Sequence, residues 1–352
     1  MASAPQASTP TGDRNPSREA ARDGIPIHKA PTGARYAAGV SLPPAYRFRA
    51  PTPDDLDAVA EVLVAGDLQD AGHSVLDVDF LQDQWSRVGL DLGTDAWVVV
   101  HGEDAIVGYG QAMREEPAIV ESWAVVHPGH RGRGIGAWLL DRIQQRASEL
   151  LTGVSAARFR HAINASDRAA AAVVAASGLR PVRHFWHMQI ELAAGFQPGP
   201  TPPGIRISRI DPPVHLRVVH AVLEEAFTDH WGHHREPFDR WAQQQTGSPS
   251  YDPTLWLLAT EAGEPVGALT ASVARGGGWV EELGVLTPWR GRGIGVALLR
   301  RSFATFAGRG LRRVLLSVDA DNPTGATKLY EHVGMRVVNR WDWWERSLGG
   351  PP

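Results

Sequence analysis

The chain contains no cysteine, and this absence removes several kinds of chemistry at once. Disulfide bonds, thiolate nucleophiles and cysteine metal sites are all excluded. Lysine is nearly absent too: only Lys29 and Lys328 occur, so arginine supplies the rest of the 35 basic residues. A Walker phosphate loop needs a lysine directly after its last glycine, and no lysine stands in such a place.

Two further absences, together with the net charge, bear on the localisation and the partners of the protein. No apolar run approaches the roughly 18 residues of a membrane helix. The first residues, MASAPQASTPTGDRNPSRE, lack the apolar stretch of a secretory signal. The formal net charge of -4 argues against binding to nucleic acid or to a membrane surface. We therefore expect a soluble, cytoplasmic protein without nucleic-acid or membrane partners.

What the chain does have is length and an internal repeat. Its 352 residues, 43% of them hydrophobic, are enough for two cores. The hexapeptide RGRGIG occurs twice, at Arg131–Gly136 and at Arg290–Gly295. Three more landmarks recur at the same offset of 159 residues, namely Trp97 and Trp256, Gly108 and Gly267, and Val126 and Val285. A constant offset indicates duplication and predicts two domains.

The residues around each hexapeptide predict the same order of elements. An extended start, a helix, a β-hairpin and a further strand precede the glycines, and an amphipathic helix follows them. A segment rich in proline and glycine at 193–203 is the expected linker between domains at 44–192 and 204–352. Residues 1–43, rich in Pro, Ala, Ser and Arg, are expected to form a disordered tail.

The hexapeptide is typical of a pyrophosphate cradle. Its glycines allow a tight turn, the first amides of the following helix have no partners, and the two arginines add positive charge. A dinucleotide-binding fingerprint fits formally at Gly132, Gly134 and Ala137. However, the second copy has Val296 in the last position, and neither copy has an acidic residue about 20 residues on. A plain glycine turn with surface arginines is the remaining alternative, which the duplication disfavours.

The longer motifs resemble those of the GCN5-related N-acetyltransferase (GNAT) superfamily. VHPGH-RGRGIG and VLTPW-RGRGIG, each followed by an amphipathic helix, are similar to motif A, and LLSVDADNPTGATKLYEHVGM is similar to motif B. The resemblance covers nearly all of residues 46–347 as two domains in tandem. This arrangement is similar to that of the mycothiol synthase-like actinobacterial acetyltransferases.

The resemblance implies an α/β fold of two tandem GNAT domains, each with a central mixed, mostly antiparallel sheet flanked by helices. It also implies transfer of an acetyl group from acetyl-CoA, as cosubstrate, to a primary amine of a small molecule. The hexapeptide, the strand before it and motif B would hold the coenzyme. The positions implied are Leu283, Gly284, Val285, Arg290, Gly291, Arg292, Gly293, Ile294, Gly295 and Asn322, and in the first domain Val126, Arg131, Gly132, Arg133, Gly134 and Gly136.

Aminolysis of a thioester needs a base for the amine, a donor for the oxyanion and an acid for the thiolate. Tyr330 occupies the position of the general acid in the resemblance. Glu281 and Glu282 lie on the preceding strand, where alternation would place them on opposite faces. Because Glu281 would share a face with Leu283 and Val285, it is the first candidate base, and Glu282 is the second. The alternatives are solvated strand-edge carboxylates and a tyrosine packed at the core rim.

The first domain has no equivalent acid. Aligning Gly178 with Gly334 places Val174 where Tyr330 stands, and Glu121 is the only carboxylate on the corresponding strand. We therefore expect this domain to be non-catalytic, with a structural or regulatory role. Two other functions remain open, a module that binds or senses acyl-CoA without transfer and an acetyltransferase for protein N-termini.

The segment AFTDHWGHHREPFDRW carries His230, His233 and His234, whose spacing could suit a metal. It lacks the His-Glu-x-x-His pattern, and Gly232 interrupts any helix, so no metal is expected. Recognition of the acceptor is the other hypothesis for this segment, with Trp231 and Phe238 as apolar contacts. Three tryptophans on the predicted last strand are expected mainly to pack, namely Trp341, Trp343 and Trp344.

Overall fold

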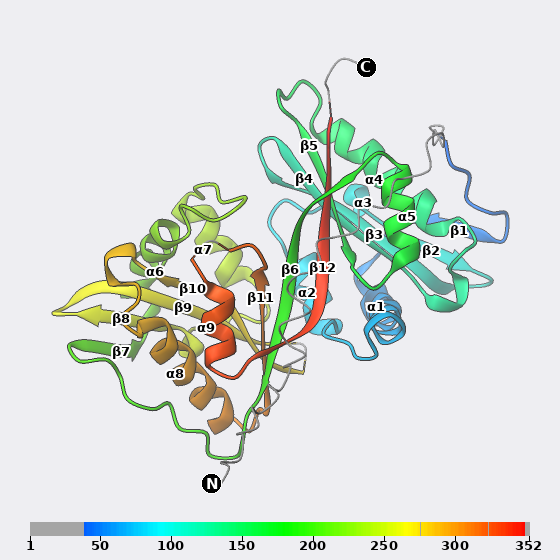
Figure 1. Ribbon diagram of the computed structural model, residues 1–352. Helices are drawn as coiled ribbons and strands as arrows, with labels where there is room; N and C mark the ends of the chain where they lie inside the picture. The colour runs from blue at the N-terminus through cyan, green and yellow to red at the C-terminus, as the bar shows by residue number, and fades with distance from the viewer. Residues whose placement is uncertain (1–38, 275, 323, 349–352) are drawn as a thin grey trace, which may run out of the picture. The chain divides into compact units, whose positions relative to one another are not determined.

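The computed structural model describes residues 39–274, 276–322 and 324–348 (Figure 1). The disordered tail expected over residues 1–43 lies, up to residue 38, outside the described residues. The elements of the first half are β1 (Tyr46–Arg49), α1 (Leu56–Ala71), α2 (Val78–Trp85), α3 (Leu92–Asp95), β2 (Ala96–His101), β3 (Ala105–Glu116), β4 (Ile119–Val126), α4 (Ile135–Leu150), β5 (Arg158–Asn164), α5 (Arg168–Ala176) and β6 (Arg180–Glu191).

The second half repeats this order, except that a 3-10 helix (Pro253–Leu255) precedes β8 where α3 precedes β2. Its elements are β7 (Ile205–Arg209), α6 (Pro212–Ala226), α7 (Phe238–Gly247), β8 (Leu257–Glu261), β9 (Glu264–Ala274), β10 (Gly277–Val285), α8 (Ile294–Gly308), β11 (Arg313–Asp319), α9 (Ala326–His332) and β12 (Arg336–Ser347). The helices and strands expected on both sides of each hexapeptide are all present. The expected fold class, a mixed sheet flanked by helices, is confirmed.

Twelve strands in the described residues form one sheet, in the order β1-β2-β3-β4-β5-β12-β6-β11-β10-β9-β8-β7. Most neighbours are antiparallel, and the parallel pairs are β4 with β5 and β10 with β11. Both parallel pairs adjoin a glycine turn, because β4 and β10 are the strands that lead into the two hexapeptides.

The centre of the sheet exchanges strands between the two halves. The last strand, β12, pairs with β5 of the first half from Trp341 opposite Asn164 to Ser347 opposite Arg158. In return, β6 of the first half pairs with β11 of the second half, and β6 and β12 also pair with each other. Each half therefore places its last strand beside a strand of the other half, so neither half completes its own sheet.

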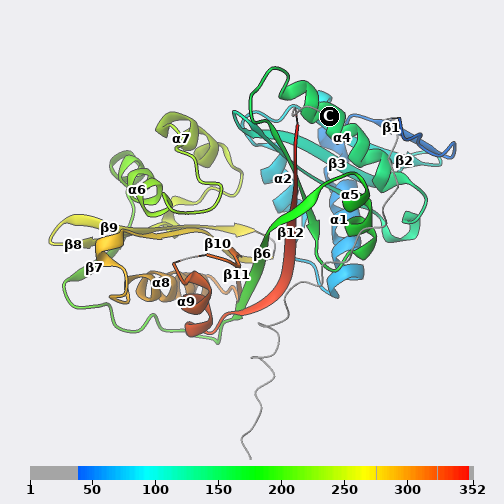
Figure 2. The same ribbon diagram turned by 45° about the horizontal axis from the view of Figure 1, so that its top comes forward.

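Helices cover both faces of the sheet, as the alternation along β2 shows. Val98 and Val100 pack in the same cluster as residues of α1, whereas Trp97 and Val99 pack with residues of α4. Because side chains alternate along a strand, α1 and α4 lie on opposite faces. Figure 2 shows the same layering in the second half, with α6 and α7 on one side of the strands and α8 and α9 on the other.

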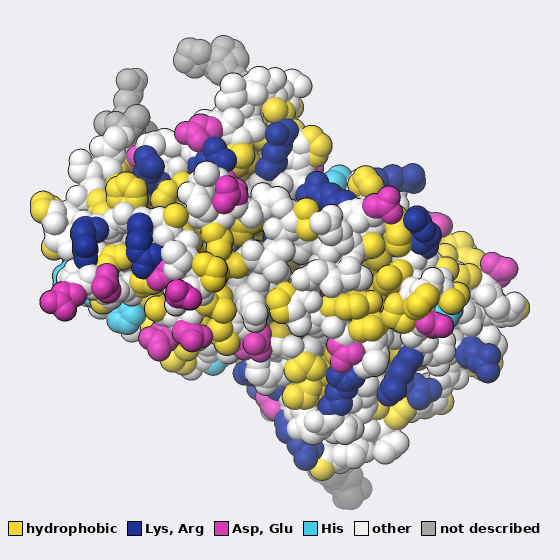
Figure 3. Space-filling model, turned by 180° about the vertical axis from the view of Figure 1, so that it is seen from behind, with side chains coloured by type: hydrophobic (Ala, Val, Ile, Leu, Met, Phe, Trp, Pro, Cys, Tyr) yellow, Lys and Arg dark blue, Asp and Glu magenta, His cyan; other side chains and the backbone are white. Residues whose placement is uncertain are grey.

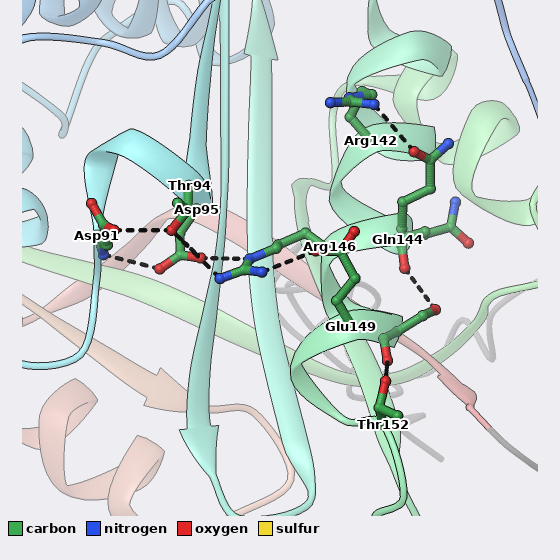
Figure 4. Close-up of polar contacts among 10 residues, drawn as sticks. Asp91, Thr94, Asp95, Arg142, Gln144, Arg146, Glu149 and Thr152 are labelled. Carbon is green, nitrogen blue, oxygen red and sulfur yellow. Dashed lines mark hydrogen bonds and ion pairs between the residues drawn. The ribbon is translucent and has the colours of Figure 1, made fainter.

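A polar cluster ties α4 to the short helix α3, which directly precedes β2 (Figure 4). Asp95 is 4% exposed and accepts a hydrogen bond from Nε of Arg146 at 2.8 Å. The same guanidinium donates to Glu149 at 2.9 Å, and Asp95 also accepts from the backbone N–H of Asp91 at 2.9 Å. A buried carboxylate with this many partners is satisfied, so it fixes the position of the helix that follows the first glycine turn.

On the face shown in Figure 3, Lys and Arg side chains are interspersed with Asp and Glu side chains, and neither charge dominates. No helix among the described residues is long and apolar enough to cross a membrane.

The exchanged strands predict that the two halves unfold together. Phe159 on β5 is fully buried in the first half's core, and its replacement by alanine should cost about 3–5 kcal/mol. Because β12 pairs with β5 and β6 pairs with β11, the loss should lower a single transition of the whole chain. Differential scanning calorimetry of Phe159→Ala checks this. Two separated transitions, with only one of them shifted, would contradict it.

Candidate active site

A glycine turn precedes each of the helices α4 and α8, which follow β4 and β10. In the second half, Gly291 and Gly293 have φ values of 75° and 77°, a left-handed conformation that favours glycine. Gly293 is the N-cap of α8 and supplies no side-chain cap. The first amides of α8 therefore have no partner within the helix, and with the helix dipole they suit a diphosphate.

The hexapeptide arginines brace the turn. Arg290 donates to the backbone oxygens of Val285 at 3.0 Å and Ala226 at 2.9 Å. Arg292 forms an ion pair with Glu261. Both guanidinium groups therefore contact protein atoms, and the backbone amides remain to contact an anion. The contribution of the two arginine charges to the cradle stays a prediction.

The strand that leads into this turn separates from its neighbour. β10 and β11 pair only from Gly278 to Val280, and the pairing of β10 with β9 shifts register between Val280 and Glu282. This β-bulge bends the strand away from β11. Beyond it, residues 283–285 pair with β9 alone, so their other edge faces a cleft. An extended pantetheine arm could pair with that edge, as the sequence led us to expect.

The cleft is a cavity of about 670 Å³. Its walls come from the strand edge, the glycine turn, the loop after β11 and helix α9, so the positions expected to hold the coenzyme are gathered here. Among the lining residues are Glu281, Glu282, Leu283, Gly284, Val285, Arg290, Gly291, Gly293, Ile294, Gly295, Asn322 and Tyr330. Arg292 is not among them, because its side chain turns to Glu261.

The two strand carboxylates differ in their surroundings. The expected alternation of Glu281 and Glu282 fails because the bulge falls at Glu281, and both side chains line the cleft. Glu281 is exposed and accepts a hydrogen bond from Ser272 at 2.6 Å. Glu282 is half-buried, with Thr270 donating to it at 3.4 Å. Burial, and then the charge of Glu281, raise the pKa of Glu282 to about 7.

Tyr330, on α9, lines the same cleft. Its side chain is 8% exposed, and burial raises the pKa of its phenol to about 12. The hydroxyl group therefore keeps its proton throughout the neutral range and can donate it to a leaving group. A base that titrates near neutrality and an acid that stays protonated are two of the three groups that aminolysis requires, the third being a donor for the oxyanion.

The corresponding cleft of the first half is smaller and lacks both groups. β4 and β5 stay paired as far as Trp123 opposite Ala162, and the cavity there measures about 340 Å³. Trp123 stands 159 residues before Glu282, at the same place opposite the neighbouring strand. Val174 lines this cavity where Tyr330 lines the other.

Carboxylates also surround the first turn. Arg131 donates to Asp70 at 2.6 and 2.9 Å, and its guanidinium lies 3.5 Å from Asp167 at the start of α5. Asp70 and Asp167 both line the cavity beside Gly132 and Gly134. These two carboxylates would repel a diphosphate placed on the amides of α4.

The histidine-rich segment lies beside the second cleft. His230 lines the cleft, and Trp231 lines an adjoining cavity. Phe238 does not line either one; it packs against His220 and Trp241. Among the described residues, no group of three or more His, Cys, Asp or Glu side chains is arranged to hold a metal ion.

Both halves match the same family. Residues 217–335 match the acetyltransferase (GNAT) family, and residues 93–173 match the acetyltransferase (GNAT) domain. The mycothiol acetyltransferase of Thermobispora bispora is 31% identical over 252 residues, covering 70% of this chain and 80% of that protein. The chain belongs to the GNAT family. It resembles the mycothiol synthase-like, tandem type.

Further relatives and solved structures belong to the same family or share its fold. The mycothiol acetyltransferase of Clavibacter michiganensis is 32% identical, covering 81% of this chain and 90% of that protein. A GCN5-related N-acetyltransferase from Sphaerobacter thermophilus has a similar crystal structure, with a TM-score of 0.75, 34% identity, and coverage of 87% and 97%. A tandem GNAT protein from the clavulanic acid pathway shares the fold, with a TM-score of 0.64 and 17% identity over 87% and 100%. This GNAT protein is therefore an acyltransferase, and GNAT acetyltransferases generally use acetyl-CoA as donor.

Proposed function

We propose that the chain transfers the acetyl group of acetyl-CoA to a primary amine of a small molecule, and that the second half carries out the reaction. The observation that carries this proposal is the cleft beside the bulge, which both Glu282 and Tyr330 line. The relatives named mycothiol acetyltransferases support a small-molecule acceptor.

The residues present fit the donor. Unpaired amides at the start of α8 would hold its diphosphate, and the free edge of Leu283–Val285 would pair with its pantetheine arm. Acetyl-CoA supplies the activated acetyl thioester. No separate lysine or metal is needed to bind the phosphates, because the helix start provides both donors and partial positive charge.

The chemistry then follows from the two side chains. Glu282, as a carboxylate, accepts a proton from the amine, directly or through one water molecule. The amine nitrogen bonds to the carbonyl carbon, and a backbone N–H at the bulge can stabilise the oxyanion. When the carbon–sulfur bond breaks, Tyr330 gives its proton to the thiolate. The products are the N-acetyl amide and free coenzyme A.

The first half has a different role in this proposal. It lacks the base and the acid, its cleft is half as large, and carboxylates stand beside its glycine turn. We propose that it contributes no turnover and that it supports the second half through the exchanged strands.

Release of free coenzyme A from acetyl-CoA, measured over a panel of primary amines, tests the proposed function. We expect amine-dependent release. Tight binding of acetyl-CoA without release in the presence of any amine would instead favour a sensing module. Release with peptides and not with small amines would favour acetylation of protein N-termini.

Replacing Tyr330 with phenylalanine removes only the hydroxyl group, so the buried ring should still pack. We expect kcat to fall about 100-fold, the lower end of the usual contribution of a general acid, with KM for acetyl-CoA nearly unchanged. Steady-state kinetics with the wild-type chain as reference checks this. An unchanged kcat in the folded variant would remove Tyr330 from the mechanism.

A further inference from the structure

The cleft of the second half opens into a second cavity, which we call the aromatic chamber. The chamber measures about 520 Å³, within the ~300–1,000 Å³ usual for small-molecule sites. The two cavities share four lining residues, Phe185, His230, Glu281 and Ser317. The two cavities therefore adjoin at Glu281, the residue before the proposed base Glu282.

Aromatic rings from both halves line the chamber. Six of them are half-buried, so part of each ring remains accessible, namely Phe80, Trp123, Phe185, Trp231, Trp341 and Trp343. Trp231 is held in place from the other half, since the guanidinium carbon of Arg160 lies 4.3 Å from its ring centroid. Trp341 and Trp343, expected mainly to pack, thus belong to the chamber lining as well.

Several polar groups that line the chamber are already engaged with one another. Arg87 forms an ion pair with Glu115 at 2.5 Å, and Arg160 forms one with Glu121 at 3.1 Å. The side-chain oxygen of Gln111 accepts a hydrogen bond from a tyrosine hydroxyl at 2.8 Å. A ligand rich in hydroxyl groups would have to compete with these contacts, whereas an aromatic ligand would use the ring surfaces.

Charge in the chamber favours a cation. Its lining holds two arginines and three carboxylates, and the third carboxylate, Glu281, stands at the junction with the cleft. An ammonium group meeting Glu281 would be placed next to Glu282, the proposed base. An anionic acceptor would gain nothing from arginines that are already paired.

We propose that the acceptor is an arylalkylamine, with its ring among the tryptophans of the chamber and its amine beside Glu281. This inference rests on the proposed function and specifies its substrate class. It also assigns a task to the first half, which supplies Trp123 and Phe185 to the wall and Arg160 to hold Trp231.

The test compares three amines with the full chain and saturating acetyl-CoA: 2-phenylethylamine, butylamine and glucosamine. We expect kcat/KM for 2-phenylethylamine to exceed that for each of the others at least tenfold. The substitution Trp343→Leu should lower this value about tenfold, through loss of one aromatic contact, and leave KM for acetyl-CoA unchanged. Trp344→Leu is the matched control, since Trp344 follows on the same strand but does not line the chamber.

Preference for glucosamine or butylamine, or equal effects of the two tryptophan substitutions, would overturn the arylalkylamine inference while keeping the proposed function. If no amine is acetylated, calorimetric titration of 2-phenylethylamine into the wild-type chain with coenzyme A separates failure of the arylalkylamine inference from failure of the proposed function. Binding that Trp343→Leu weakens would support the chamber and contradict the proposed transfer. Absence of binding would overturn the inference as well.

Discussion

Replacing Glu282 with glutamine should reduce kcat/KM for the amine by about 100- to 10,000-fold, the usual contribution of a positioned base. In the proposed mechanism, the carboxylate form of Glu282 is the active one, and the pKa of this group is raised to about 7. The rate should therefore rise with pH through a midpoint of about 7. Glu282→Gln cannot lose a proton there, so this limb of the pH profile should disappear along with most of the activity.

The neighbouring carboxylate provides the matched control. Glu281 raises the pKa of Glu282 because two nearby negative charges disfavour ionisation. Glu281→Gln removes that repulsion, so the midpoint of the pH profile should move to lower pH while the limb persists. If Glu281→Gln abolished the limb and Glu282→Gln kept it, the two roles would be reversed, and Glu281 would be the base.

Placing a carboxylate at the second glycine turn should nearly abolish use of acetyl-CoA. Gly293 adopts φ 77°, a conformation that aspartate tolerates better than most residues, and no atom closer than 3.7 Å meets an added Cβ. In Gly293→Asp the new charge lies at the amides that would hold the diphosphate. Loss of one or two charge-assisted hydrogen bonds, each about 1.5–3 kcal/mol, should raise KM for acetyl-CoA at least tenfold.

The chain contains its own control for this experiment. Gly134 holds the equivalent position in the first half, with φ 87° and open space around it. Gly134→Asp introduces the same residue with similar backbone strain, and turnover should stay within twofold of the wild type. Gly293→Asn introduces a side chain of the same shape without the negative charge, so it separates the effect of the charge from that of the altered backbone. A loss of turnover in Gly134→Asp equal to that in Gly293→Asp would show that the first half is needed for catalysis.

Most helices and strands could be predicted because their signals are local. Apolar spacing marked α1, α4, α6 and α8, and alternation marked the hairpins and strands that precede the glycines. The shorter helices α2, α3 and α7 were not predicted. For α2, the signal was present in Asp77, whose side chain accepts a hydrogen bond from the N–H of Phe80 and caps the helix.

In the candidate site, too, the residues that could be predicted are those that belong to a local sequence motif. Tyr330 and the glycine turn could be found by position in a motif, since each depends on a few neighbouring residues. Thr270 and Ser272, which contact the two glutamates, were missed because they lie on a different strand. Preference between Glu281 and Glu282 could not be decided from alternation, because one extra residue at a bulge reverses the faces that follow.

The duplicated architecture, the two glycine turns and the unequal motifs of the halves could be read from the order of residues alone, because each rests on residue types and spacing along the chain. Tertiary structure alone decided that the halves exchange strands, that one cleft opens further than the other, and that tryptophans from β4 and β12 share a chamber. These features depend on which strands pair and where a register shifts. Residues 220 positions apart, such as Trp123 and Trp343, line one cavity only through those pairings.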